Sequence, residues 1–176
     1  MPLAECGGAA RGDVLGAVVR RLDAGWVHPG AAFEDAVAGE NVNVKRRGQN
    51  MAAYDWRRDG RRVACKGAQL KWNAHDERWM LQFQNVKLAA PGEAEAAFDE
   101  LQLAAYTPEG VHLFRHDLRA GVSTVGKATA ATGRQIAFVG PQHEASWHVA
   151  LAAILEKMEA KGCRRLAFVP WDVGAS

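Results

Sequence analysis

The sequence is poor in cysteine and has no long apolar run. Its three cysteines, Cys6, Cys65 and Cys163, are odd in number and lack C-x-x-C spacing, which argues against a disulfide framework and a structural zinc site. No stretch approaches the about 18 apolar residues that a membrane span needs, and the N-terminus carries no apolar signal region. We therefore expect an intracellular protein from a reducing compartment, with no membrane partner and the organelle left open.

Net charge is also nearly absent, since 22 basic against 20 acidic residues leave +2. A value this small does not by itself indicate a nucleic-acid partner. The distribution says more, because basic residues gather between positions 45 and 62, as contact with a phosphate backbone would require. They are Lys45, Arg46, Arg47, Arg57, Arg58, Arg61 and Arg62. The alternative interpretation is a solvated loop rich in arginine.

The length of 176 residues, 48% of them hydrophobic, suits one domain with a single core over 1–176. Apolar spacing predicts helices over 14–22 and 144–161, the second ended by Gly162. Turn signals at 59–60 and 108–110 indicate hairpins. Strands are expected at 41–44, 51–56, 61–66, 70–72, 78–86, 101–106, 111–114, 136–139 and 166–169. This order predicts an α/β (α+β) fold with a mixed central sheet and flanking helices.

Asp55 and Lys66 are the residues of this strand-rich part that indicate chemistry. The turn at 59–60 lets the strand that ends near Asp55 pair with the strand that carries Lys66. Because side chains alternate along a strand, positions 64 and 66 share one face and Cys65 takes the other. Divalent-metal nucleases use carboxylates to hold a hard cation and a lysine to assist the attacking water. The pair therefore predicts a site for metal-assisted phosphodiester hydrolysis.

The segment YDWRRDGRRVACKGAQLKW, residues 54–72, resembles the central hairpin of PD-(D/E)XK nucleases. The pattern of that family is an Asp, a turn, then (D/E)-x-K, with a Gln three residues after the Lys in many members. Asp55, Lys66 and Gln69 match it, whereas Ala64 stands where the family has its second carboxylate. The match is confined to this short segment, although the order of the flanking elements also resembles the family's core.

The resemblance implies a Mg²⁺-dependent (or Mn²⁺-dependent) endonuclease acting on DNA, built on a restriction-endonuclease-like core. Asp55 would bind the metal, Lys66 would assist the nucleophile, and Gln69 would position it. Cys65 and Glu34 are the further candidate metal ligands, and Glu40 is a second choice in place of Glu34. The expected nucleic-acid contacts are Lys45, Arg46, Arg47, Arg57, Arg58 and Lys127.

Ala64 has two explanations under this resemblance. Either an acid was removed there, as one would do to trap an uncut complex, or the chain is a natural relative that has lost its acid. In both cases the loss of a negative ligand predicts a nearly inactive enzyme. The alternative function is a catalytically silent nuclease-like module that binds nucleic acid. A homodimer stays open, because cutting both strands of a duplex with one small site calls for two copies.

Two further features bear on nucleic-acid and nucleotide binding. Residues 121–127, GVSTVGK, resemble the start of a P-loop, but Ala128 replaces the Ser or Thr that would bind magnesium. We therefore expect no nucleotide cofactor, and a flexible loop in which Lys127 and Arg134 could contact phosphates. Trp56 and Trp72 flank the proposed site and are candidates for stacking on bases.

Overall fold

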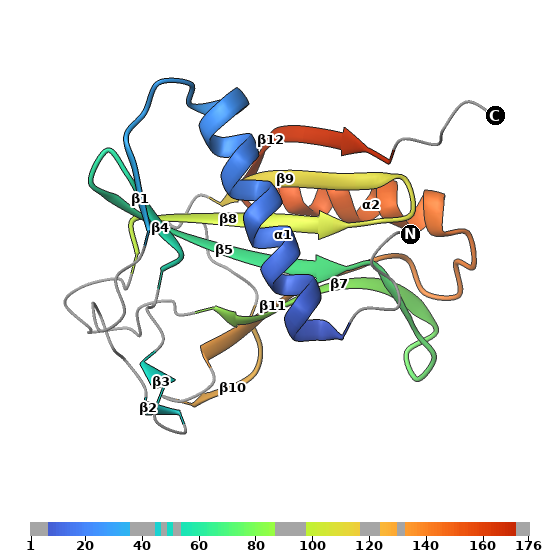
Figure 1. The fold of residues 1–176 in the computed structure, drawn as a ribbon. Coiled ribbons are helices and arrows are strands. Elements are labelled where there is room, and N and C mark those ends of the chain that lie inside the picture. The colour runs from blue at the N-terminus through green and yellow to red at the C-terminus, as the bar shows by residue number, and fades with distance from the viewer. Residues whose placement is uncertain are drawn as a thin grey trace.

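The computed structural model describes residues 7–35, 45–46, 49–50, 54–86, 98–116, 124–129 and 133–171, with the backbone alone described at 8–9, 45–46, 49–50, 124–129 and 133–134. Over these ranges the chain forms two α-helices, a π-helical turn and three β-sheets (Figure 1). The predicted mixed α+β class is confirmed at this level.

A mixed six-stranded sheet forms the centre of the fold. Its strands, in spatial order, are β1 (Phe33–Asp35), β4 (Trp56–Arg58), β5 (Arg61–Gln69), β8 (Glu100–Tyr106), β9 (Gly110–His116) and β12 (Cys163–Pro170). Only β5 and β8 run parallel, and the other neighbours are antiparallel. The predicted turn between β4 and β5 is confirmed, because Asp59 and Gly60 have φ of 47° and 76°, as a two-residue hairpin turn requires.

A second, antiparallel sheet joins the first through β5. It contains β10 (Thr124–Thr129), β11 (Gly133–Val139), β7 (Arg78–Val86) and β6 (Lys71–Asn73), and a short pair is formed by β2 (Lys45–Arg46) and β3 (Gln49–Asn50). Leu70 alone separates β5 from β6, and its backbone N–H donates to the Tyr106 carbonyl at 2.8 Å. One continuous stretch of chain therefore belongs to both sheets and turns at Leu70.

The helices lie on opposite faces of the six-stranded sheet, with α1 (Gly8–Leu22) in front and α2 (Trp147–Ala160) behind in Figure 1. Leu15 and Val19 of α1 belong to a buried cluster with Val63 and other sheet residues. Ile154 and Met158 of α2 belong to a second cluster, which extends to β7 and β11. The π-helical turn η1 (Asp23–Val27) continues α1.

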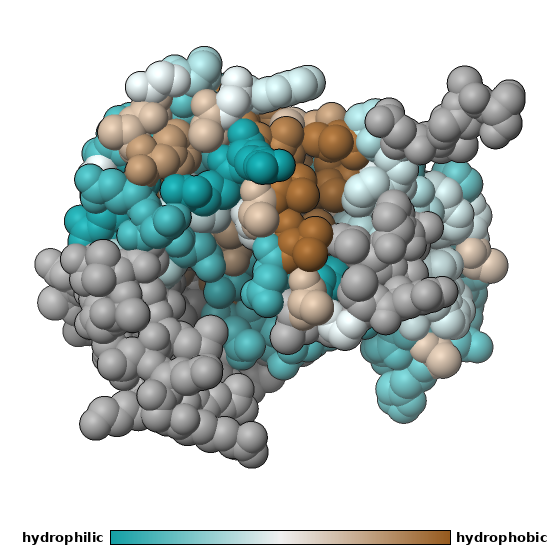
Figure 2. Space-filling model, in the orientation of Figure 1, coloured by the Kyte–Doolittle hydropathy of each residue, from teal (hydrophilic) through white to brown (hydrophobic). Residues whose placement is uncertain are grey.

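The front face is covered unevenly by α1. Figure 2 shows apolar side chains gathered beside the helix on this face. Leu166 and Ala167 of β12 are only partly buried there, and Val14 on α1 is 42% exposed. Val63 on β5 is fully buried, so α1 covers the β5 side of the face more completely than the β12 side.

Several expected boundaries differ from the structure. The helix expected at 14–22 begins at Gly8, and the loop expected at 121–127 is wrong for 124–127, which belong to β10. The strand expected at 51–56 is replaced, within the described residues, by β4 at Trp56–Arg58, while 41–44 lies outside those residues. The strand at 78–86 is confirmed at both ends.

Candidate functional site

A cavity of about 620 Å³ lies between β5, β7 and the N-terminal half of α1. Its lining residues are Arg11, Gly12, Asp13, Leu15, Asp55, Cys65, Lys66, Gly67, Ala68, Gln69, Lys71, Met80, Gln82, Gln84 and Asn85. Three of these side chains are cationic, two are acidic and four are amides. The cavity is therefore polar and carries one net positive charge.

The cavity forms beside parts of β5 and β7 that each have a hydrogen-bonded strand neighbour on one side only, within the described residues. β5 pairs with β4 only up to Val63, and β7 pairs with β6 only from Arg78 to Met80. Beyond these points β5 stays in the six-stranded sheet and β7 in the four-stranded sheet. Within the described residues, the edge of β5 from 65 to 69 therefore has no strand partner on the cavity side.

Asp55 closes the first part of this open edge. Its backbone N–H donates to the Val63 carbonyl at 2.8 Å, and its Oδ2 accepts the backbone N–H of Cys65 at 2.6 Å. The carboxylate thus takes the place of a strand partner for Cys65. Asp55 is exposed, and its Oδ1 makes no hydrogen bond to the rest of the described chain. One carboxylate oxygen remains available to a ligand.

Lys66 lies at the centre of the β5 wall. Its side chain is half-buried and, within the part of the chain that the structure describes, forms no hydrogen bond or ion pair. An ammonium group without a protein partner binds water or an anion. Lys66 is therefore the lining group best suited to hold an anionic ligand.

Gly67 explains how α1 reaches the cavity. A Cβ at this position would lie 2.9 Å from Cδ1 of Leu15, which is closer than carbon atoms approach without displacement. Next to it, Arg11 of α1 donates a hydrogen bond from Nη1 to Oε1 of Gln69. The helix is therefore held directly against β5, and it brings Asp13 to the rim of the cavity.

Of the predicted catalytic residues, Asp55, Lys66 and Gln69 line this one cavity, and Ala64 does not. Ala64 is fully buried in the cluster that contains Tyr54. The expected alternation holds, because Ala64 packs in one cluster and Cys65 packs against the other. Position 64 therefore faces the interior of the protein, whereas the cavity begins one residue further along the strand.

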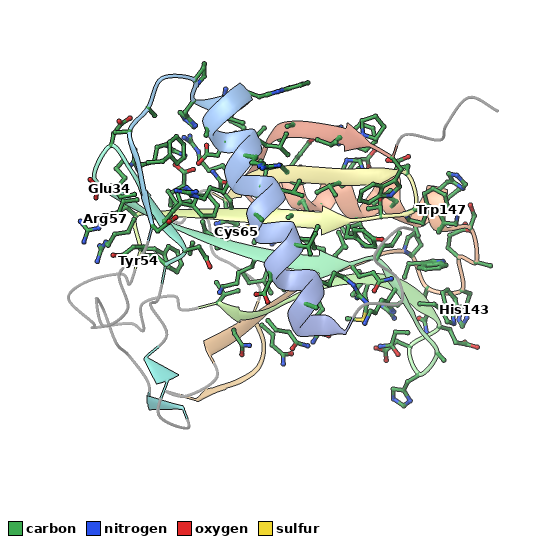
Figure 3. All side chains as sticks on the ribbon, in the orientation of Figure 1. Glu34, Tyr54, Arg57, Cys65, His143 and Trp147 are labelled. Atoms are coloured by element: carbon green, nitrogen blue, oxygen red, sulfur yellow. The ribbon has the colours of Figure 1, made fainter. Side chains whose placement is uncertain are left out.

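The expected metal ligands do not assemble around one point. Asp55 and Cys65 line the cavity, but Glu34 is exposed on β1 and lies away from Cys65 in Figure 3. No group of three His, Cys, Asp or Glu side chains suited to a metal occurs among the described residues. Burial raises the pKa of the Cys65 thiol, and the charge of Asp55 raises it further, so the thiolate that a metal would need is disfavoured. Glu40 lies outside the described residues.

Arg58 was expected to contact nucleic acid, and this expectation is wrong. The residue is 4% exposed, and its guanidinium is bound by two buried carboxylates, with Nη1 2.8 Å from Asp23 and Nη2 2.7 Å from Glu100. Trp56 is also excluded as a base-stacking residue, because it is 1% exposed and its indole N–H donates to Asp23. Both side chains hold the interior of the fold together.

For several of the other expected nucleic-acid contacts, the structure does not describe the side chain. Arg57 is half-buried and donates from Nε to the Tyr54 hydroxyl at 3.2 Å. Trp72 is 41% exposed. Lys45 and Arg46 lie on β2, and Lys127 lies on β10. At these three residues, and at Arg134, the structure describes the backbone alone. Arg47 lies outside the described residues. The basic stretch from 45 to 62 is thus not one surface, since Arg58 points inward.

The sequence analysis did not predict the cavity residues contributed by α1, β6 and β7. The missed lining residues with polar side chains are Arg11, Asp13, Lys71, Gln82, Gln84 and Asn85. The alternation of Gln82 and Gln84 with buried Leu81 and Phe83 was visible in the sequence and could have indicated a polar face. Asp13 gave no such signal, because the helix was expected to begin at position 14, whereas α1 already includes Asp13.

Comparison with protein-family models, curated proteins and solved structures gave no match. No helix of the described chain combines the length and apolar character needed to cross a bilayer.

Proposed function

We propose that this cavity binds a phosphodiester of nucleic acid, and that the chain is a nuclease-like domain whose Mg²⁺-dependent hydrolysis is weak because position 64 carries no acid. The observation that supports this proposal best is that Asp55 and an unpaired Lys66 line the same cavity. Lys66 would neutralise the phosphate, and Arg11 and Lys71 add positive charge to the same cavity.

The donor types in the cavity suit magnesium, which prefers carboxylate oxygens and water. Mg²⁺ takes one or two protein carboxylates and completes its coordination with water and substrate phosphates. Asp55, through Oδ1, and Asp13 are the two carboxylates that line the cavity. When bound, the ion would supply charge for the phosphate and acidify a water molecule. Gln69 would orient that water, while Lys66 would hold the phosphate oxygens.

A silent binding module is the second candidate, and the burial of Ala64 favours it. The side chain is 0% exposed and packs in the core, so no carboxylate is offered to the cavity from this position. The neutral thiol of Cys65 does not replace it. In this second candidate function, the cavity binds phosphate and performs no hydrolysis.

A DNA-binding assay tests the phosphate binding that both candidate functions share. Fluorescence anisotropy with labelled single-stranded and duplex DNA would be measured in EDTA across a salt series, for the wild type, Lys66→Met and the exposed control Lys161→Met. We expect Lys66→Met to weaken binding and to lower the salt slope by about 1, as the loss of one phosphate contact does. Binding unchanged by Lys66→Met, or no binding at low salt, would contradict the proposal.

Cleavage separates the two candidates. Cleavage of labelled single-stranded and duplex DNA with Mg²⁺ would be compared between the wild type and Asp55→Asn, which removes the charge from the cavity and keeps an acceptor for the Cys65 N–H. Mg²⁺-dependent cleavage by the wild type that Asp55→Asn abolishes would support the nuclease. A wild type that binds DNA without cutting it would establish the silent module instead.

A further inference from the structure

The wall of the cavity formed by β7 contains a β-bulge. In the pairing of β7 with β11, Arg134 lies opposite Val86 and Ile136 lies opposite Phe83. Two steps along β11 therefore correspond to three along β7, which inserts one extra residue between Phe83 and Val86. Asn85 has φ of 57°, in the left-handed region that asparagine tolerates better than most side chains do.

The bulge lies in the part of β7 that lines the cavity. Gln84 and Asn85, the two residues between Phe83 and Val86, both line it. Bulges occur often beside active sites. This part of β7 thus places two neighbouring amide residues in the cavity wall.

These two amides differ from the other two in the cavity. Gln69 is bound by Arg11, and Gln82 donates to Oε1 of Gln135 at 2.7 Å. Gln84 and Asn85 are exposed and form no hydrogen bond within the described chain. An amide presents a donor and an acceptor side by side, so the pair offers two of each to a ligand.

The dimensions of the cavity limit the ligand that can enter. About 620 Å³ lies in the range of roughly 300–1,000 Å³ that holds one small molecule. α1 lies over β5, and Leu15 leaves no room even for a Cβ on Gly67. A duplex, whose major groove alone is about 12 Å wide, is too large for this space.

We propose that the cavity takes one unpaired nucleotide, with its phosphate near Lys66 and the edge of its base hydrogen-bonded by Gln84 and Asn85. The inference rests on the proposed function and names its substrate class as single-stranded nucleic acid or a nucleotide turned out of a duplex. The donors and acceptors on the Watson–Crick edge of a base are available only when the base is unpaired, and matched side-chain amides recognise such edges.

The first test compares paired with unpaired probes. Labelled homopolymers of deoxyadenylate, deoxycytidylate and thymidylate, an abasic strand of equal length and a blunt hairpin duplex would be titrated in EDTA. We expect the homopolymers to bind more tightly than the duplex, with affinities that differ by at least about fivefold between the best and worst base, the lower end for one bidentate contact. Equal or tighter binding of the duplex would overturn the inference.

The second test uses variants with matched roles. Gln84→Ala and Asn85→Gly, in which glycine accepts the positive φ, would be compared with the exposed control Gln142→Ala and with Lys66→Met. The two amide variants should lose the preference among bases and keep their affinity for the abasic strand, which a purely structural defect would not do. Lys66→Met should weaken binding of every strand. An unchanged base preference in both amide variants, together with weaker binding by Lys66→Met, would end this inference and leave the proposed function standing.

Discussion

Oδ2 of Asp55 lies 2.6 Å from the backbone nitrogen of Cys65, directly before β4 begins and where the edge of β5 opens into the cavity. The same carboxylate therefore completes a strand edge and presents its other oxygen to solvent. This double role means that structural and chemical effects of Asp55 must be separated by the choice of substitution.

Asp55→Ala should lower the free energy of unfolding by about 0.5–1.5 kcal/mol, because it removes the acceptor of an exposed hydrogen bond from the Cys65 N–H. Asp55→Asn should retain most of the stability, since its amide oxygen can accept the same bond. Urea unfolding of both variants measures the difference. Equal losses in the two variants would show that the charge of Asp55, and not its acceptor, stabilises the edge.

The reactivity of Cys65 should report the charges of the cavity. Burial raises the pKa of this thiol, Asp55 raises it further, and Lys66 opposes them. We expect slow alkylation of Cys65 near neutral pH, faster alkylation in Asp55→Asn and slower alkylation in Lys66→Met. Iodoacetamide labelling followed by peptide mass spectrometry measures the rate at this cysteine alone. The opposite order of the two variants would contradict the geometry.

Gly67→Ala should destabilise the protein by about 1 kcal/mol, because its Cβ would lie 2.9 Å from Leu15 Cδ1 and would displace this end of a flexible side chain. Gly16→Ala is the matched control within α1, where a Cβ has open space around it. This control should gain about 0.5–1 kcal/mol, since alanine is the better helix former. Chemical unfolding of both variants decides the matter, and a Gly67→Ala variant as strongly stabilised as Gly16→Ala would disprove the close approach.

Arg58→Met should cost about 3–5 kcal/mol, because it leaves the buried carboxylates of Asp23 and Glu100 without their shared cation. The neighbouring Arg57→Met changes a half-exposed arginine and should cost about 1 kcal/mol or less. Thermal and urea unfolding of the two variants would be compared. Similar small losses would mean that the buried ion pairs contribute little.

His112 should make stability fall as pH falls below neutrality. Burial lowers the pKa of this imidazole and Arg165 acts in the same direction, while Glu109 opposes them from 2.9 Å. The folded protein therefore favours the neutral ring. The stabilisation by the neutral ring is complete at pH values above the pKa of His112 in the unfolded chain, about 6.5. It is lost as the pH drops towards the lower pKa of His112 in the folded protein.

The measurement is urea unfolding between about pH 7.5 and 5.5, which spans the unfolded pKa. His112→Phe keeps a ring against Phe168, whose ring centroid lies 4.4 Å away, and should flatten the dependence on pH. The exposed His75→Gln should leave the dependence unchanged. A wild-type protein whose stability is constant across this interval would contradict the assignment.

Local sequence patterns were sufficient to predict a strand that has one buried and one polar face. The alternation of Leu81 and Phe83 with Gln82 and Gln84 defined β7 at both ends, and the Asp-Gly pair defined the β4–β5 turn. The start of α1 was not predictable in this way. Its glycine-rich first turns have weak helix propensity, and contacts between Leu15 and Gly67, far apart in the sequence, hold this half of the helix in place.

The site could be predicted only where its residues lie on one hairpin. Asp55, Lys66 and Gln69 are close in the sequence and reach one cavity. Arg58 was misassigned because its partners Asp23 and Glu100 lie 35 and 42 residues away, so the sequence shows only a member of a basic run. The amide pair at 84 and 85 depends on the register of β7 against β11, which no local pattern encodes.

The turn of the chain at Leu70 sets the width of one end of the cavity. Its hydrogen bond to Tyr106 and the pairing of β6 with β7 fix the two walls to each other at this end. The spacing of the walls beside Lys71 is therefore held by backbone hydrogen bonds and does not depend on which side chains line the cavity.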